Sequence, residues 1–149
     1  MWLIRKILFP FSLIYGVVVY VRNRCYDLGL FSSKSFDVPL ICIGNLSTGG
    51  TGKTPMVELL IELLQQDYKV AVLSRGYKRK SKGFVLAKAH STAEELGDEP
   101  FQIFTKFTDI TVAVDADRRN GIARLTKESE PDVIILDDAF QHRKVKPKY

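Results

Sequence analysis

Short apolar runs alternate along the chain with segments in which apolar residues recur at helical spacing. The apolar runs predict strands at 39–43, 69–73, 110–114 and 132–136, and a shorter one at 84–86. The segments between them predict helices at 53–66, 99–106 and 117–127. Because strands and helices that alternate in this way build a parallel sheet flanked by helices, the pattern predicts an α/β fold.

The first of these helices is amphipathic by its spacing. Its apolar residues at positions i, i+3, i+4, i+7 and i+8 are Met56, Leu59, Leu60, Leu63 and Leu64. Charged and polar side chains occupy other positions, so we expect these five residues to face the core.

A separate apolar segment opens the chain. Residues 7–21 carry no charge, and basic residues lie on both sides of them. As a helix this segment would be about 22 Å long, against a bilayer hydrocarbon core of roughly 30 Å. A helix lying in one leaflet, or a marginal transmembrane anchor, fits the length and the basic flanks. A cleaved signal peptide is a second interpretation, but no small-residue cleavage site follows Val21. A buried core helix is the third interpretation.

We therefore divide the chain into an apolar membrane-associating helix at 1–24 and a second domain at 25–149. The stretch 22–37 is polar and rich in turn residues, which predicts a connector.

Composition and charge narrow the class of protein. With 46% hydrophobic and 26% charged residues, the 149-residue chain is unlike a disordered one. The formal charge of +5 is concentrated at 78–82 and 143–148, which suits phosphates, anionic lipids or nucleic acid, or a solvated surface. The two cysteines form no C-x-x-C pair, and the two histidines are too few and too scattered to predict a zinc site. Nothing in the sequence points to a secreted domain held by disulfides, which favours a reducing cytoplasmic setting.

A glycine-rich motif separates the strand 39–43 from the helix 53–66. It consists of Ser47, Thr48, Gly49, Gly50, Thr51, Gly52, Lys53 and Thr54. A strand, such a loop and a helix together form a phosphate-binding P-loop, in which backbone N–H groups surround the phosphates. Lys53 can reach the terminal phosphates and the Thr54 hydroxyl can hold Mg²⁺. The sequence therefore predicts ATP-type nucleotide binding by a P-loop NTPase-like sheet, with a glycine-rich turn as the alternative.

Two acidic pairs are candidates for the chemistry. Asp137 and Asp138 follow an apolar strand, and an acid at the carboxyl end of such a strand can hold Mg²⁺. Asp98 and Glu99 lie between predicted strands, where Asp98 is either a helix N-cap or a general base, with Glu99 assisting the metal. A strand-terminating acidic turn is the alternative for the first pair.

Four blocks in this order resemble one known family. They are 44–55, Ser74-Arg75-Gly76-Tyr77, Gly97-Asp98-Glu99-Pro100, and 136–142 with the sequence Leu-Asp-Asp-Ala-Phe-Gln-His. These blocks are similar to the motifs of tetraacyldisaccharide 4'-kinase, the lipid A kinase of Gram-negative bacteria. Members of that family continue beyond the second acidic block, so we expect this chain to be an N-terminal portion. Ala139 stands where a glycine is common, and His142 is not assigned the role of a histidine that the family supplies from later sequence.

The resemblance implies transfer of the ATP γ-phosphoryl group to the 4'-hydroxyl of a tetraacyl glucosamine disaccharide 1-phosphate, giving lipid IVA. It implies Lys53 and Asp98 as catalytic residues, and Thr54, Glu99, Asp137 or Asp138 as Mg²⁺ ligands. Contacts to the substrate headgroup are expected from Arg75, Tyr77 and Arg119, with surface solvation as the alternative for the two arginines. The implied partners are the lipid A disaccharide precursor and the cytoplasmic face of the bacterial inner membrane, with no nucleic acid and no obligate protein partner.

Two other classes of protein remain open. The glycine-rich loop also resembles that of ATP-driven positioning switches, some of which bind membranes. Those switches usually carry a second lysine where this chain has Thr48, and they lack the long connection that follows the strand 69–73. A non-catalytic membrane-bound fragment is the third possibility.

Overall fold

The computed structural model describes residues 2–28, 30, 34–44, 53–137 and 145, with the side-chain surroundings of 2–11 and 27 outside that description. The chain divides into two units, Met1–Ser33 and Lys34–Tyr149. Each unit is described by itself.

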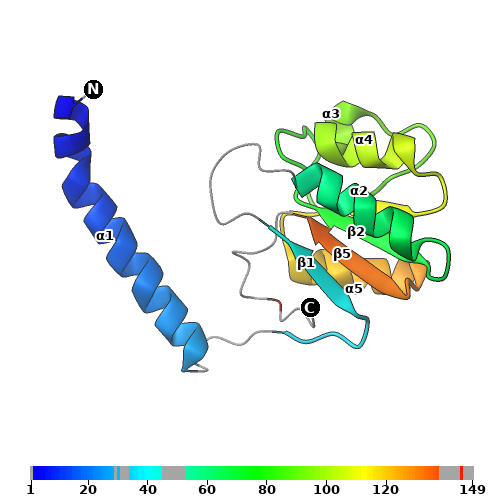
Figure 1. Ribbon diagram of the computed structural model, residues 1–149, viewed down its shortest axis with the longest axis horizontal. Helices are drawn as coiled ribbons and strands as arrows, with labels where there is room; N and C mark the ends of the chain where they lie inside the picture. The colour runs from blue at the N-terminus through cyan, green and yellow to red at the C-terminus, as the bar shows by residue number, and fades with distance from the viewer. Residues whose placement is uncertain (1, 29, 31–33, 45–52, 138–144, 146–149) are drawn as a thin grey trace. The chain divides into compact units, whose positions relative to one another are not determined.

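The first unit contains one long helix, α1, which runs over Trp2–Asp27 (Figure 1). We expected a polar connector from Arg22, and this was wrong for the first part of that stretch. Neither glycine nor proline occurs between Gly16 and Gly29, so nothing in the sequence interrupts the helix earlier. Backbone bonds from Leu28 N to Arg24 O and from Leu30 N to Cys25 O, both 2.9 Å, follow the last turn.

Large apolar side chains along α1 are more than half exposed. They are Leu13, Ile14, Tyr15, Val17, Val18, Tyr20 and Val21. In the part of the chain that the structure describes, no helix is both long enough and apolar enough to cross a bilayer.

The second unit is built on a five-stranded, mostly parallel sheet with the order β1-β5-β2-β4-β3. The strands are β1 (Leu40–Ile43), β2 (Val70–Ser74), β3 (Val85–Leu86), β4 (Thr111–Val114) and β5 (Val133–Asp137). Every pairing is parallel except that of β3 with β4. The predicted α/β sheet is therefore confirmed, with a short antiparallel strand at one edge.

Helices cover both faces of this sheet (Figure 1). They are α2 (Lys53–Leu64), α3 (Ala93–Leu96), α4 (Asp98–Lys106) and α5 (Arg118–Ser129). On one face, Val133 and Ile135 of β5 share a core with residues of α2 and α4. On the other face, Ile134 and Leu136 pack with Ile122 of α5. Burial on both faces explains why the strands are apolar without interruption.

The buried face of α2 differs from the expected one. Val57 and Ile61 are fully buried, and Leu60 and Leu64 pack against the same core. Met56, Leu59 and Leu63 are 50%, 48% and 64% exposed, so the predicted placement of these three was wrong. Because α2 is apolar around most of its circumference, two stripes have helical spacing, and the pattern alone could not distinguish them.

A glycine allows α5 to approach the sheet closely. A Cβ at Gly121 would lie 2.8 and 2.9 Å from the two methyl carbons of Leu73 and 3.1 Å from Asp115 Cβ. These distances are shorter than van der Waals contact, so any side chain there must displace the helix or the strand.

Replacing Gly121 with valine is therefore expected to lower the free energy of unfolding by about 1–3 kcal/mol, through overpacking. Urea denaturation measures the change. The matched control is Ala123→Val on the exposed face of the same helix, which adds methyl groups without a steric conflict. Equal stability of the two variants would contradict a close contact between α5 and the sheet.

Candidate functional site

Four parallel strands end at the same edge of the sheet, and the predicted site residues gather there. Ile43, the last residue of β1, lies in register with Asp137, the last residue of β5. Ser74 ends β2 and pairs with Val114 at the end of β4. This carboxyl edge is the place where open α/β sheets bind ligands.

The connection that leaves this edge after β1 leads to the first turn of α2. Lys53 and Thr54 are its first two residues, and both are partly buried. The N-terminus of a helix carries partial positive charge and free N–H groups, which favour an anion. The predicted phosphate-binding residues 47–52 lie outside the described residues, so their role stays a prediction.

Asp137 is a buried carboxylate at the end of β5, with only 3% of its surface exposed. Ser74 Oγ donates a hydrogen bond to its Oδ2 over 3.2 Å. The acid is thus held between the ends of β1 and β2, in the position expected for a metal ligand of a nucleotide site. Asp138 lies outside the described residues.

Asp98 is the first residue of α4, and the N-cap is Gly97. The alternative in which Asp98 caps the helix is therefore wrong. Gly97 takes φ of +93°, and a Cβ there would lie 3.0 Å from the carbonyl oxygen of Tyr77 and 3.2 Å from Gly76 Cα. This contact between backbones brings the start of α4 against the segment that follows β2.

The Asp98 and Glu99 side chains are both exposed. They lie in the first turn of α4, at the end of the helix that carries partial positive charge. Among the described residues, the Asp98 carboxylate has no hydrogen bond or ion pair.

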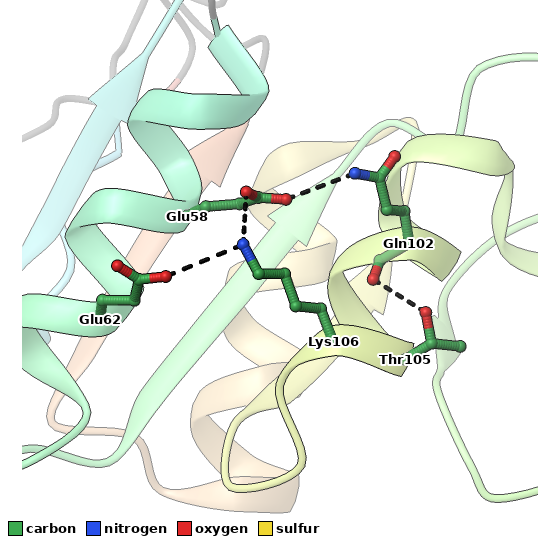
Figure 2. Close-up of polar contacts among 5 residues, drawn as sticks. All are labelled: Glu58, Glu62, Gln102, Thr105 and Lys106. Atoms are coloured by element: carbon green, nitrogen blue, oxygen red, sulfur yellow. Dashed lines mark hydrogen bonds and ion pairs between the residues drawn. The ribbon is translucent and has the colours of Figure 1, made fainter.

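A polar cluster joins α2 to α4 (Figure 2). Lys106 Nζ lies 2.7 Å from Glu58 Oε2 and 3.8 Å from Glu62 Oε1. Gln102 Nε2 donates to Glu58 Oε1 over 3.4 Å. The helices joined in this way begin with Lys53 and Asp98, so the cluster links the two predicted catalytic residues through their helices.

The three predicted substrate contacts lie on two connections. Arg75 and Tyr77 follow β2, and the Tyr77 side chain is 75% exposed. Arg119 is the second residue of α5, with its Nε 3.9 Å from Asp117 Oδ1. Since β2 and β4 are neighbours, both connections leave the same edge. All three residues are described, and no hydrogen bond or ion pair joins them to one another.

Arg79, in the basic cluster 78–82, forms hydrogen bonds within its own loop. Its Nη1 donates to Ser81 Oγ over 2.9 Å and its Nη2 to the Gly83 carbonyl over 2.6 Å. Burial lowers the pKa of the Arg79 guanidinium from its ordinary value, an effect that the Asp115 carboxylate opposes. Because an arginine side chain remains charged in proteins, Arg79 contributes a fixed positive charge to the loop that follows β2.

The sequence reasoning missed Ser74, Asp115, Arg118 and Asn120. Asp115 directly follows β4 and is 3% exposed. Its Oδ1 accepts from Asp117 N over 2.9 Å and its Oδ2 from Asn120 Nδ2 over 2.6 Å. The available signal was an acid after an apolar strand, as at Asp137, whereas nothing in the pattern distinguished Arg118 from Arg119.

The donor set suits magnesium bound with a nucleotide. In the described part of the chain, no three His, Cys, Asp or Glu side chains gather into a metal site. Mg²⁺ bound with nucleotides needs only one or two protein oxygens, because phosphates and water supply the others. The Asp137 carboxylate at the sheet edge and the Thr54 hydroxyl at the start of α2 are oxygen donors of this kind.

A mostly parallel sheet, a helix N-terminus with a lysine and a buried acid beside it are typical of nucleotide-binding α/β proteins. The family model of tetraacyldisaccharide-1-P 4'-kinase, LpxK, matches residues 4–149. This chain belongs to that family.

Individual relatives agree. The chain is 61% identical over 145 residues to the tetraacyldisaccharide 4'-kinase of Flavobacterium johnsoniae, covering 97% of this chain and 43% of the relative. The kinase of Bacteroides thetaiotaomicron is 61% identical over 146 residues, with 97% and 38% covered. A crystal structure of LpxK from Aquifex aeolicus in complex with ATP superposes with a TM-score of 0.89 at 42% identity, over 97% of this chain and 47% of that one. The chain thus spans less than half the length of these proteins.

The ion cluster between α2 and α4 predicts a pH dependence. The hydrogen bond to Glu58 raises the pKa of Lys106 above its ordinary value, with the charges of Glu58 and Glu62 adding to the effect and partial desolvation opposing it. A raised pKa in the folded state gives stability that is complete below the unfolded pKa of about 10.4 and is lost as the pH rises through the folded value. The difference in unfolding free energy between the native protein and Lys106→Met should therefore be constant from neutral pH to about 10 and shrink above that.

Urea denaturation across this pH range measures the difference. Lys127→Met, an exposed residue in the last turn of α5, is the control for loss of a lysine charge. A difference that falls between pH 6 and 9 would contradict the role given to Lys106.

Proposed function

We propose that the protein carrying this chain transfers the γ-phosphoryl group of ATP to the 4'-hydroxyl of a tetraacyl glucosamine disaccharide 1-phosphate, giving lipid IVA in lipid A biosynthesis. Membership of the tetraacyldisaccharide-1-P 4'-kinase family supports the proposal. The observation that carries it is the register between β1 and β5, which sets the buried Asp137 beside Ile43, the strand residue that leads into the glycine-rich segment. The same edge carries Lys53, the first residue of α2.

The phosphates of ATP are held by backbone N–H groups of residues 47–52 and by the Lys53 ammonium group, in a P-loop NTPase-like arrangement. Thr54 and Asp137 provide oxygen ligands for Mg²⁺, with Asp138 and Glu99 as further candidates. Bound Mg²⁺ neutralises phosphate charge as it develops. The protein's own contribution is to position the phosphates against the acceptor.

Asp98 accepts the proton of the attacking 4'-hydroxyl. Its support is the exposed position at the start of α4 and the close backbone approach at Gly97, which keeps this turn against the segment that follows β2. A general base of this kind must lie within hydrogen-bond reach of the hydroxyl. Arg75, Tyr77 and Arg119 contact the substrate headgroup from the neighbouring connections.

The substrate's acyl chains lie in a membrane, and α1 places the kinase there. The helix exposes large apolar side chains from Leu13 to Val21, which suits a helix lying in the interface at residues 1–24. The proposed location is the cytoplasmic face of the bacterial inner membrane, where the basic residues at 78–82 would face anionic headgroups.

Replacing Lys53 with alanine is expected to abolish phosphorylation while leaving membrane association intact, because the proposed membrane contact is made by α1 and the proposed phosphate contact by Lys53. A radiolabel transfer assay and vesicle sedimentation measure the two properties. The control is Lys127→Ala, which removes a surface lysine from the last turn of α5, outside the proposed site. Unchanged turnover in the Lys53 variant would refute the role of the glycine-rich loop.

Replacing Asp98 with alanine is expected to slow transfer by about 10²–10⁴-fold with ATP binding largely unaltered, since a base acts on the acceptor. Single-turnover kinetics and calorimetry separate the two effects. Asp109→Ala, an exposed acid beyond the end of α4, should transfer at the native rate. A native rate in the Asp98 variant would remove it from the mechanism.

The assay that tests the proposal uses ATP, Mg²⁺ and the disaccharide acceptor. It compares this chain with a version extended by the sequence that the relatives carry beyond the matched region. ATP turnover that depends on the lipid acceptor supports the kinase. Turnover stimulated by a protein or DNA partner instead supports the positioning switch.

A further inference from the structure

A buried arginine occupies the carboxyl edge without a part in the proposed chemistry. Arg118 is the first residue of α5 and only 1% of its surface is exposed. Burying a guanidinium costs several kcal/mol unless good hydrogen bonds compensate. The presence of one among the ends of apolar strands therefore points to a specific task.

The Arg118 guanidinium reaches two strands at once. Its Nη1 donates to the carbonyl oxygen of Asp115 over 2.5 Å, and its Nη2 donates to the carbonyl oxygen of Asp137 over 3.0 Å. These residues follow β4 and end β5, which are not neighbours, because β2 lies between them. No backbone ladder can join them, so the arginine makes a link that the sheet cannot make.

The central strand completes the link. Asp115 N donates to the carbonyl oxygen of Ser74 over 3.0 Å, and Ser74 Oγ donates to Asp137 Oδ2 over 3.2 Å. Asp137 is thus held at two points, its carbonyl oxygen by Arg118 and its carboxylate by Ser74. Holding the carbonyl oxygen restricts the backbone at the Cα from which the side chain extends, and the Ser74 bond restricts the side-chain torsions, so together they limit the direction of the carboxylate.

We propose that Arg118 is a positioning residue that sets the direction of the Asp137 carboxylate toward the magnesium of a bound nucleotide. The inference rests on the proposed function, in which Asp137 is a metal ligand. Replacing a residue that orients a metal ligand typically lowers metal affinity or activity by about 10–100-fold. A planar fork donates to two carbonyls from two nitrogens at a fixed spacing, whereas lysine offers a single nitrogen without that spacing.

The test measures ATP affinity by calorimetry, first in EDTA and then at rising free Mg²⁺. Arg118→Lys keeps the charge but loses the fork, so it should shift the Mg²⁺ midpoint upward by about 10–100-fold. Affinity in EDTA should be unchanged, since the phosphates still meet Lys53. Arg124→Lys, which removes the contact of two guanidinium nitrogens with Glu128 on the same helix, should leave the midpoint at its native value.

A double-mutant cycle with Asp137→Asn shows whether Arg118 acts through Asp137. Arg118→Lys should shift the midpoint in the native background and cause no further shift when Asp137 is already replaced. A native midpoint for Arg118→Lys, or an equal shift in both backgrounds, overturns the inference. If Arg118→Lys melts below the assay temperature, Arg118→Gln, which keeps a planar donor without the charge, is measured in the same cycle.

Failure of the proposed function would look different. It would show as no Mg²⁺-dependent ATP binding by the native protein, or as a native Mg²⁺ midpoint in Asp137→Asn alone, and the inference would fall with it. A native protein that binds Mg-ATP normally, beside an Arg118→Lys variant that does the same, refutes the positioning role alone.

Discussion

Coverage of the sheet on both faces decides where polar chemistry can occur in this protein. The central strands β2 and β5 bury every residue, with α2 and α4 on one side and α5 on the other. A polar side chain along such a strand would lack partners, so it must lie at an end. Ser74, Asp115 and Asp137 occupy the ends of three strands and meet through hydrogen bonds there. The candidate site is thus a consequence of how the core is closed.

The two helices on one face extend this constraint to the predicted catalytic residues. α2 begins with Lys53 and α4 with Asp98, and both helices share the core of Val57, Ile61 and Ile103. Their exposed sides are joined by the contacts of Glu58 with Lys106 and Gln102 (Figure 2). Packing sets the separation of the helices and the polar cluster limits sliding, so the two N-termini are held as a pair.

The sequence predicted the strands well because residues buried on both faces leave continuous apolar runs, and the positions of Lys53, Thr54 and Asp137 followed from them. It misplaced the buried face of α2, since an apolar helix offers more than one stripe and only tertiary packing selects Val57 and Ile61. Arg118 could not be found in advance, because a buried arginine has no local pattern. One of its partners, Asp137, ends a later strand and is brought to it only by the fold.

Nothing in the sequence around Gly97 predicted its close backbone contact, because that contact is made with Gly76 and Tyr77. A Cβ at Gly76 would in turn lie 2.8 Å from the carbonyl oxygen of Leu96. The excursion that leaves after Gly76 and returns at Gly97 is therefore closed at its neck by main-chain atoms. At Gly83 a Cβ would meet nothing within 4 Å, but the φ of +68° favours glycine, so we expect the exposed side chains around it to be the ones that can change without altering the neck. Such a neck would keep the proposed base in place while the exposed surface of the excursion varies.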